Sequence, residues 1–400
     1  MNCFLEKIPV FSYALYSYTS SYLHEKEKEF MQKKLTFCIK KAILSCRKEG
    51  GAMHRFDYSF LHNGMLPAGL LNITADIYAL RVMVLGRKEQ YTDVFTELAN
   101  IAKVQSVKSS NEIEGIVTTD ERINEIVNGN SAPLNHNEQE IAGYRDALAQ
   151  IHTGYADMDF RESDILRLHA IMMNIAGYAY AGKYKEYDND IIEEDKFGRR
   201  RVRFHPTSAA DTPDEMEQLV LAYQEARDDP NINQLLLIPC VVLDFLCIHP
   251  FRDGNGRISR LLSLLLLYRN DFDAGKYISF EEQINNRKGN YYDALKQSSD
   301  GWHENQNDYS AFIMEFLTTV YMCYKELDKR FAVVGSRKVT KQARVEATIL
   351  NSLTPVSKAE ILKILPDVSA TTVEAVLGQM VRDGSVRKIG SGRATRYIKS

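Results

Sequence analysis

The chain has 400 residues, of which 44% are hydrophobic, so it is long enough to bury a sizeable core in two or three domains. Its 50 lysines and arginines against 53 aspartates and glutamates leave a net charge of −3, which argues against nucleic-acid binding through overall charge. The six cysteines show no metal-ligand spacing and fit a reducing, cytoplasmic setting; we expect Cys240 and Cys247 to be buried thiols.

Residues 1–52 are interpreted as an N-terminal extension. Ile8 to Tyr22 is rich in tyrosine and serine, and it is too short and too polar to span a bilayer. It also lacks the basic start and the cleavage site of a secretory signal. Glu25 to Arg47 is charged and can form a helix. Nothing in this segment carries recognisable chemistry, and we expect no membrane partner.

Four helices are predicted between residues 65 and 175. The first is Leu70 to Leu85 with Gly86 at its end, and the second is Tyr91 to Val107. Glu138 to Ile151 and Ser163 to Ile175 carry apolar residues at helical intervals, and Ser163 is a suitable N-cap for the last of the four.

A short stretch, Ser109 to Gly115, follows the second of these helices. Ser110 and Glu114 are four residues apart, so they share one face if the stretch is helical. Gly115 can adopt the left-handed conformation that commonly ends a helix. Taken alone, the pattern is typical of an ordinary capped helix with an acid on its surface.

Tyr184 to Pro206 predicts a β-hairpin. Its arms are Asp190 to Ile192, which is acidic, and Arg201 to Phe204, which is basic, with a turn at Lys196 to Arg199. On these residues alone it is a surface hairpin. His169, in the apolar helix before it, is interpreted as a packed histidine rather than a ligand.

The functional argument depends on His249 to Arg260, whose sequence is H-P-F-R-D-G-N-G-R-I-S-R. An apolar helix leads into this stretch, and Pro239 is expected in the first turn of that helix, where its missing N–H costs nothing. Ile258 to Tyr268 has leucines on nearly every face, which predicts a buried outgoing helix.

Gly254, Asn255 and Gly256 fall at the start of the outgoing helix. A helix start binds anions through its unpaired N–H groups and its dipole, and glycines let phosphate oxygens approach the backbone. Arg257 and Arg260 are three residues apart on one face, so both can reach the same polyphosphate.

Asp253 and His249 add the groups needed for chemistry on a phosphate. A carboxylate that faces phosphates usually holds a bridging Mg2+. The imidazole ends the incoming helix, in range to take a proton from an attacking hydroxyl. Each residue alone has a structural explanation, as a turn, a helix end or a solvated face. The whole string predicts a site for in-line attack on a nucleotide phosphate.

Three more helical segments surround the motif. Thr212 to Ala226 precedes it, whereas Arg287 to Leu295 and Trp302 to Arg330 follow it. The second contains Tyr291 and Tyr292, which are either core residues or contacts for a nucleotide.

Residues 331–340 contain glycine and serine and predict a linker, and residues 341–400 then carry ten basic against five acidic residues. Three helices and two strands are predicted in this region: Val345 to Leu353, Lys358 to Leu365 after a Ser357 cap, Thr371 to Asp383 after a Ser369 cap, Ser385 to Ile389, and Thr395 to Ile398.

This order of elements resembles a winged helix–turn–helix domain. By that resemblance Thr371, Thr372 and Gln379 lie on the recognition helix, and Arg393 lies at the tip of the wing. Such domains bind DNA or serve in protein interactions, and both alternatives stay open.

His249 to Arg260 resembles the signature of the Fic family, H-P-F-x-[D/E]-G-N-G-R-x-x-R, at every specified position. The resemblance implies an enzyme that moves AMP from ATP to a hydroxyl side chain of a protein. It also implies these roles: His249 as general base, Asp253 on Mg2+, Gly254, Asn255, Gly256 and Arg257 on the phosphates, Arg260 on the γ phosphate, Tyr292 on the nucleotide, and Phe251 as a buried anchor.

The stretch with Ser110, Glu114 and Gly115 resembles the inhibitory helix of Fic proteins, [S/T]-x-x-x-E-[G/N]. By that resemblance Glu114 pairs with Arg260 and blocks productive binding of the γ phosphate, because an arginine committed to a carboxylate cannot clamp phosphate. In some relatives the same glutamate supports removal of AMP.

The hairpin at 184–206 resembles the flap by which Fic proteins hold a target segment through strand addition. Lys185 stands where many relatives carry arginine, and this flap is longer than most, which leaves the choice of target open.

We therefore expect a mostly α-helical chain with a Fic core and a C-terminal winged helix. The expected parts are an extension (1–52), a helical region (53–135) with the inhibitory helix (109–115), the core (136–330) with its flap, a linker (331–340) and the winged helix (341–400).

The expected function is Mg2+-dependent transfer of AMP from ATP to a target protein or to the chain itself, restrained by Glu114. The alternatives are a nucleotide-sensing regulator that binds DNA, and a relative that transfers another phosphate-containing group. A homodimer is compatible with the sequence.

Overall fold

The computed structural model describes residues 54–129, 131–194, 198–335, 340–350, 352, 355–392 and 395–400. The predictions for residues 1–52, the centre of the hairpin turn at 195–197, and Arg393 lie outside these residues.

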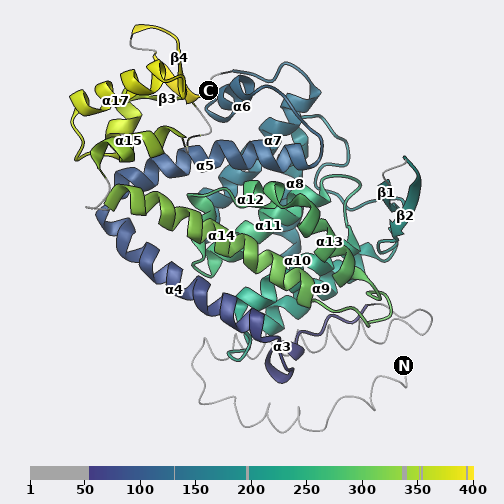
Figure 1. The fold of residues 1–400 in the computed structure, drawn as a ribbon. Coiled ribbons are helices and arrows are strands. Elements are labelled where there is room, and N and C mark those ends of the chain that lie inside the picture. The colour runs from purple at the N-terminus through teal and green to yellow at the C-terminus, as the bar shows by residue number, and fades with distance from the viewer. Residues whose placement is uncertain are drawn as a thin grey trace, which may run out of the picture. The chain divides into compact units, whose positions relative to one another are not determined.

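Helices dominate the described part of the chain (Figure 1). They are α3 (Phe60–Asn63), α4 (Ala68–Gln90), α5 (Thr92–Ile113), α6 (Asp120–Val127), α7 (His136–Gly154), α8 (Glu162–Asn174), α9 (Thr212–Arg227), α10 (Gln234–Ile248), α11 (Asn255–Arg269), the 3-10 helix η1 (Asp273–Lys276), α12 (Phe280–Asn286), α13 (Lys288–Ser299), α14 (Ser310–Gly335), α15 (Lys341–Leu350), α16 (Lys358–Ile364) and α17 (Ala370–Arg382). The strands are β1 (Ile191–Glu194), β2 (Arg200–Phe204), β3 (Val356–Ser357), β4 (Val386–Ile389) and β5 (Arg396–Lys399).

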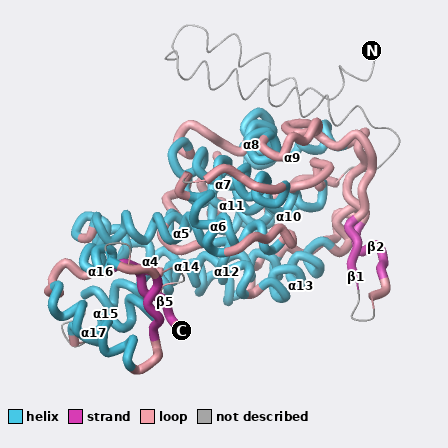
Figure 2. Tube along the Cα trace, turned by 90° about the horizontal axis from the view of Figure 1, so that it is seen from above, coloured by secondary structure: helices cyan, strands magenta, loops and turns pink. Residues whose placement is uncertain are grey.

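A single hydrophobic core runs from Phe56 to Phe331 and joins the N-terminal helices to those that carry the motif. α10 and α11 lie inside it, with α9 against α10, α7 and α8 against α11, and α4 against α14 (Figures 1 and 2). Every residue of α10 from Leu235 to Ile248 is buried, as the apolar sequence predicts.

The predicted start of this central helix is wrong. α10 begins at Gln234, where the Asn233 side chain accepts a hydrogen bond from the Leu235 N–H (2.9 Å), and Pro239 lies inside the helix. A proline in a helix interior removes one backbone hydrogen bond. The fully buried apolar residues on both sides of Pro239 offset that cost. A rule that considers only the local preference of proline does not include this burial.

Three other local predictions also fail. Gly86 lies within α4, which continues to Gln90, and Ser163 lies within α8, whose N-cap is Arg161. Trp302 is a buried residue in a turn before α14, and the helix starts at Ser310. α14 then continues to Gly335, so it occupies the first part of the predicted linker.

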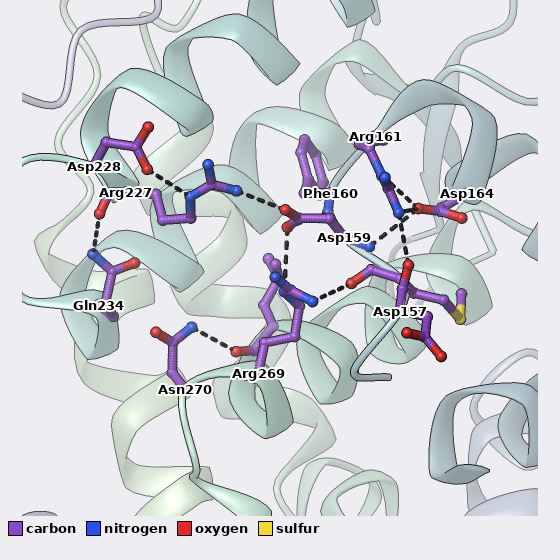
Figure 3. Close-up of polar contacts among 12 residues, drawn as sticks. Asp157, Asp159, Phe160, Arg161, Asp164, Arg227, Asp228, Gln234, Arg269 and Asn270 are labelled. Carbon is purple, nitrogen blue, oxygen red and sulfur yellow. Dashed lines mark hydrogen bonds and ion pairs between the residues drawn. The ribbon is translucent and has the colours of Figure 1, made fainter. Parts of the chain in front are cut away.

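The far end of α11 is held by a group of charged residues (Figure 3). Arg269 donates to three backbone carbonyls within residues 155–158, and its Nε lies 3.4 Å from Asp159. The other oxygen of Asp159 accepts a hydrogen bond from Arg227 at the end of α9 (2.6 Å). The helix that begins at the motif is thereby fixed at its opposite end.

The hairpin forms as predicted, with β1 and β2 antiparallel and Glu193 opposite Arg201. The register shifts between Ile191 and Ile192, which locally bends the arm nearest the core. Ile192 and Val202 face each other and are exposed, so one face of the hairpin presents apolar side chains to solvent.

The C-terminal region has its own core, which α15, α16 and α17 share with the strands. Its sheet has the order β3-β5-β4, and β3 was not predicted. Ser357 caps α16 in a capping box with Glu360, and Ser369 caps α17, as the sequence predicts. α16 contacts α5, where Lys363 pairs with Glu97 (3.3 Å).

Candidate active site

His249 ends α10 in a left-handed conformation, with φ 52° and ψ 59°. Such a conformation is uncommon for a residue other than glycine. Pro250 follows, and a proline disfavours the helical conformation of the residue before it, so the helix stops here. The Nδ1 of His249 lies 3.3 Å from the Leu246 carbonyl. This contact favours the tautomer with the proton on Nδ1, which leaves the Nε2 lone pair available as a base.

Burial, with the charge of Lys185 as the next cause, lowers the pKa of His249 to about 4. Lys185 is itself buried, and its Nζ donates to the Asn189 side chain (2.9 Å) and to the Ile248 carbonyl (3.2 Å). His249 is therefore neutral at physiological pH, which is the state a general base requires.

The loop after His249 is held from inside. Phe251 is fully buried and its ring stacks on His169, with centroids 3.8 Å apart. Both backbone groups of Phe251 bond to the Asn255 side chain, which accepts from its N–H (2.9 Å) and donates to its carbonyl (2.8 Å). The sequence placed Asn255 on the phosphates, whereas in the structure its amide fixes the shape of the loop.

His169 is packed, as predicted. Its Nδ1 accepts from the Gly182 N–H (2.9 Å), and its Nε2 lies 3.1 Å from the Asp253 carbonyl. Burial lowers the pKa of His169 to about 4, so the ring stays neutral beside the loop. It supports the motif rather than reacting.

Gly254 has φ 82° and is the N-cap of α11, so the helix starts where the sequence predicts. The first turn presents backbone N–H groups that have no partner within the helix. Asp253 lies beside it with its carboxylate half exposed, and one oxygen accepts from the Gly254 N–H (2.6 Å). An anion with several oxygens fits against this turn.

Arg257 is 1% exposed and its NH1 lies 2.7 Å from Glu140, which also accepts from the Tyr178 hydroxyl (3.1 Å). Its Nε has no hydrogen-bond partner in the described part of the chain. A buried guanidinium donor without a partner, next to a helix start, fits a phosphate oxygen.

The residues of the motif can hold Mg2+ only if phosphate oxygens supply further ligands. Among the described residues, no group of three or more His, Cys, Asp or Glu side chains is placed to hold a metal. Asp253 is the one carboxylate of the motif, and Mg2+ is commonly held by one carboxylate together with phosphate oxygens and water.

Arg260 is 2% exposed and is fully engaged with the end of α5. Its NH2 donates to Glu114 Oε1 (2.8 Å) and to the Ser110 carbonyl (2.9 Å), and its Nε donates to the Ser110 hydroxyl (2.9 Å). Gly115 follows with φ 78° and ends the helix. The structure thus brings together the two motifs that the sequence separates by 146 positions.

Burial alone would raise the pKa of Glu114, but the charge of Arg260 and its hydrogen bond, with Arg257 and Lys288, lower it overall. Glu114 is therefore ionised at neutral pH. Its carboxylate lies against the first turn of α11, because a Cβ atom added to Gly256 would lie 2.4 Å from Glu114 Oε1. The protein's own anion occupies the side of the helix start that the sequence assigned to phosphate.

A cavity of about 320 Å³ opens beside these groups. Its lining includes Glu114, His249, Gly256, Tyr292 and the hairpin residue Arg203. Tyr292 lines this cavity, whereas Tyr291 is buried, and the contact of Tyr292 with a nucleotide stays a prediction. The motif residues Asp253, Asn255, Arg257 and Arg260 are not part of the lining.

The sequence did not predict the contacts that four residues make around the site: Glu140, Lys185, Arg203 and Lys288. Lys288 donates to the Ile113 carbonyl (2.7 Å) and so holds the end of α5, and Arg203 donates to the Ser299 hydroxyl (3.1 Å). Only Glu140 gave a signal, since it is a charged residue on the apolar face of a predicted helix.

Residues 159–267 match the family model described as Fic/DOC family. A Fido domain-containing protein of Dictyostelium discoideum is 29% identical over 138 residues, which are 34% of this chain and 90% of that protein. A Fic family protein from Desulfovibrio desulfuricans has the same fold, with a TM-score of 0.56 at 20% identity over 84% of this chain and 97% of that one.

The segment from residue 159 to residue 267, which carries the helix start and the histidine beside it, is thus similar to the Fic/DOC family. The similarity to the Fido domain-containing protein covers about a third of the chain. The matched segment contains the hairpin and the motif, but neither Glu114 nor residues 341–400. The inhibitory helix and the winged helix therefore stay predictions.

The position of Lys185 predicts its effect on the base. Lys185→Met removes a positive charge that disfavours the imidazolium, so we expect the pKa of His249 to rise from about 4 towards its ordinary value of 6.5. An NMR titration of the labelled imidazole rings measures this shift. Lys183→Met, which removes an exposed lysine from the same segment, is the control. An unchanged His249 titration in Lys185→Met contradicts the assignment.

Proposed function

We propose that this protein is a Mg2+-dependent adenylyltransferase that moves AMP from ATP to a hydroxyl side chain of a target protein or of itself. One observation carries the proposal: a neutral histidine lies beside a helix start that binds anions, and both border one cavity. Members of the family commonly transfer AMP onto proteins. Its expected place is the cytoplasm.

In the proposed reaction each residue of the site has a separate role. His249 Nε2 takes the proton of the acceptor hydroxyl, whose oxygen attacks the α phosphorus while the bond to the β-phosphate oxygen breaks and pyrophosphate leaves. The N–H groups of the first turn of α11 and the Arg257 guanidinium hold the charge on the phosphates. Mg2+ held by Asp253 and the phosphates would supply further positive charge there.

Glu114 restrains this reaction in the proposal. The γ phosphate needs Arg260, and Arg260 is committed to Glu114 and Ser110. Two anions cannot share one buried guanidinium without repulsion, so ATP either loses this contact or displaces Glu114. Because Glu114 borders the same cavity as His249, it also suits a role in removing AMP with water.

The hairpin supports the target side of the reaction. Ile191 and Arg203 line the cavity, so a segment that lies along the hairpin comes close to His249. A strand edge offers backbone N–H and C=O groups to any extended peptide, which positions a hydroxyl without requiring a fixed target sequence.

Loss of the Glu114 carboxylate predicts a gain of activity. We expect Glu114→Gly to raise AMP incorporation about tenfold or more, which corresponds to about 1.4 kcal/mol or more in the activation barrier. Radiolabelled ATP with the label at the α phosphate measures incorporation into the chain or a lysate. Glu112→Gly makes the same exchange on the same helix end, where the side chain bonds only Asn285, and should leave activity low. Equal labelling of Glu114→Gly and wild type would exclude the restraint.

The role of His249 predicts a loss of chemistry without a loss of binding. In the Glu114→Gly background, His249→Ala should reduce labelling at least a hundredfold, as removal of a general base does. Binding of a fluorescent ATP analogue should change less than about threefold, because the phosphates rest on α11 and the arginines. His205→Ala, in an exposed hairpin histidine, serves as the control. Retained transfer would show that another group is the base.

A regulator that binds DNA is a second candidate, favoured by the basic C-terminal region. Thr371 and Gln379 are exposed on α17, and Arg387 and Lys388 are exposed on β4, as on a winged helix that meets a duplex. A random duplex titrated at several salt concentrations distinguishes the candidates. A regulator should bind tightly with a steep salt dependence that Arg387→Glu reduces. Weak binding, equal in both proteins, would exclude this function.

A further inference from the structure

α4 has two apolar faces, and among the described residues one of them packs into the core whereas the other is largely exposed, apart from the ring of Tyr78, which contacts Phe272 (centroids 5.3 Å apart). Its inner face, with Leu70, Ile77 and Val84, packs into the core against α14. By length and composition α4 is apolar enough to cross a bilayer, but that inner face is already held by protein. The outer face carries the apolar side chains of the helix that have the largest exposed fractions, with Val82 68% and Leu71 55% exposed.

The exposed residues of α4 form two sets, and within each set the residues are seven positions apart, as in the heptad of a coiled coil. One set has small or β-branched side chains, and the other set, three positions further along, has larger side chains. The first set is Ala68, Ala75 and Val82, the second is Leu71, Tyr78 and Leu85, and all six are exposed. Alternating spacings of three and four residues are the pattern of a helix that packs lengthwise against another helix.

We propose that this face pairs with α4 of a second copy of the chain, antiparallel and around a two-fold axis. An axis level with the middle of the pattern, between residues 76 and 77, places Ala75 opposite Tyr78 of the partner subunit. The same symmetry places Leu71 opposite the partner's Val82, and Ala68 opposite the partner's Leu85. Each large side chain thus meets a smaller one, which is how helices pack closely.

The neighbours of the heptad fit the same occupant. Asn72, Ala79 and Gly86 flank it on one side, so on that side nothing bulky or charged prevents close approach. On the other side the Arg81 guanidinium is paired with Asp271 of its own chain (3.0 Å). Asp76 is exposed one position away from the line of contact. Antiparallel helices also align their dipoles favourably.

The size of the contact predicts its strength. From Ala68 to Leu85 the helix is about 27 Å long, at about 1.5 Å per residue. A helix pair of this length buries on the order of 1,000 Å² in total, close to the lower limit for a specific interface. The dimer should therefore be reversible and should depend on concentration. It requires neither ATP nor a target protein.

Sedimentation velocity of the full chain over a range of concentrations tests the proposal. Wild type should pass from monomer to dimer, and Val82→Glu should raise the dimer dissociation constant at least tenfold because it places a charge in the contact. Met83→Glu is the matched control. It changes an exposed apolar residue (48% exposed, against 68% for Val82) one position away from the heptad line, and it should dimerise like wild type. A wild type that stays monomeric at high concentration overturns the proposal, as does equal weakening by both variants.

A disulfide experiment identifies the occupant directly. In the double variant Ala75→Cys, Tyr78→Cys, two pairs of cysteines should meet across the axis, so mild oxidation should give a covalent dimer. Asp76→Cys, level with the axis but facing away from the contact, should give little. Cross-linking to a native cysteine of the same chain would show that the chain itself covers this face, and binding of wild-type monomer to phosphatidylcholine vesicles would show a membrane. Either result overturns the proposal.

Discussion

A buried guanidinium needs an anion, and this requirement organises the site. Arg260 lies 2% exposed in the core, where an unpaired charge would cost several kcal/mol. In the structure Glu114 supplies the anion, and Ser110 accepts two further hydrogen bonds from the guanidinium. The same requirement can be met by a phosphate group. Under the proposed function, the end of α5 and a nucleotide would therefore compete for the same buried charge.

The other contacts that hold the motif do not involve the pairing of Arg260 with an anion. Pro250 stops α10 at His249, Asn255 and the ring of His169 hold Phe251, and Arg269 fixes the far end of α11. None of these contacts depends on whether Glu114 or phosphate pairs with Arg260. When a binding site already has its bound conformation, little of the binding free energy of an anion is spent on rearranging the protein, which is the benefit of preorganisation. Under the proposed function, we therefore expect activation to move mainly the Glu114 side chain and the helix end that carries it.

The sequence predicted what short-range rules govern and missed what the tertiary structure decides. The left-handed Gly115, and the caps Ser357 and Ser369, follow from local backbone chemistry. Pro239 was misplaced because the burial of its neighbours outweighs a lost hydrogen bond. The contacts of Lys185, Arg203 and Lys288 with the site were not predicted because these residues come from segments that meet the motif only after folding. The pairing of Glu114 with Arg260 came from a family resemblance, and no local rule contains it.

α4 shows why composition alone could not assign its surfaces. Its apolar residues occur around the whole helix, which is equally typical of a bilayer span, a core helix and a helix between two protein surfaces. Packing of Ile77 and its neighbours identifies one face as core. The residues left over are not random, because Leu71, Tyr78 and Leu85 keep a period of seven that solvent does not require. A regular line of apolar side chains is unfavourable in water, but it becomes favourable when a second helix covers it. Burial by another helix is therefore the simplest physical reason for such a line to exist.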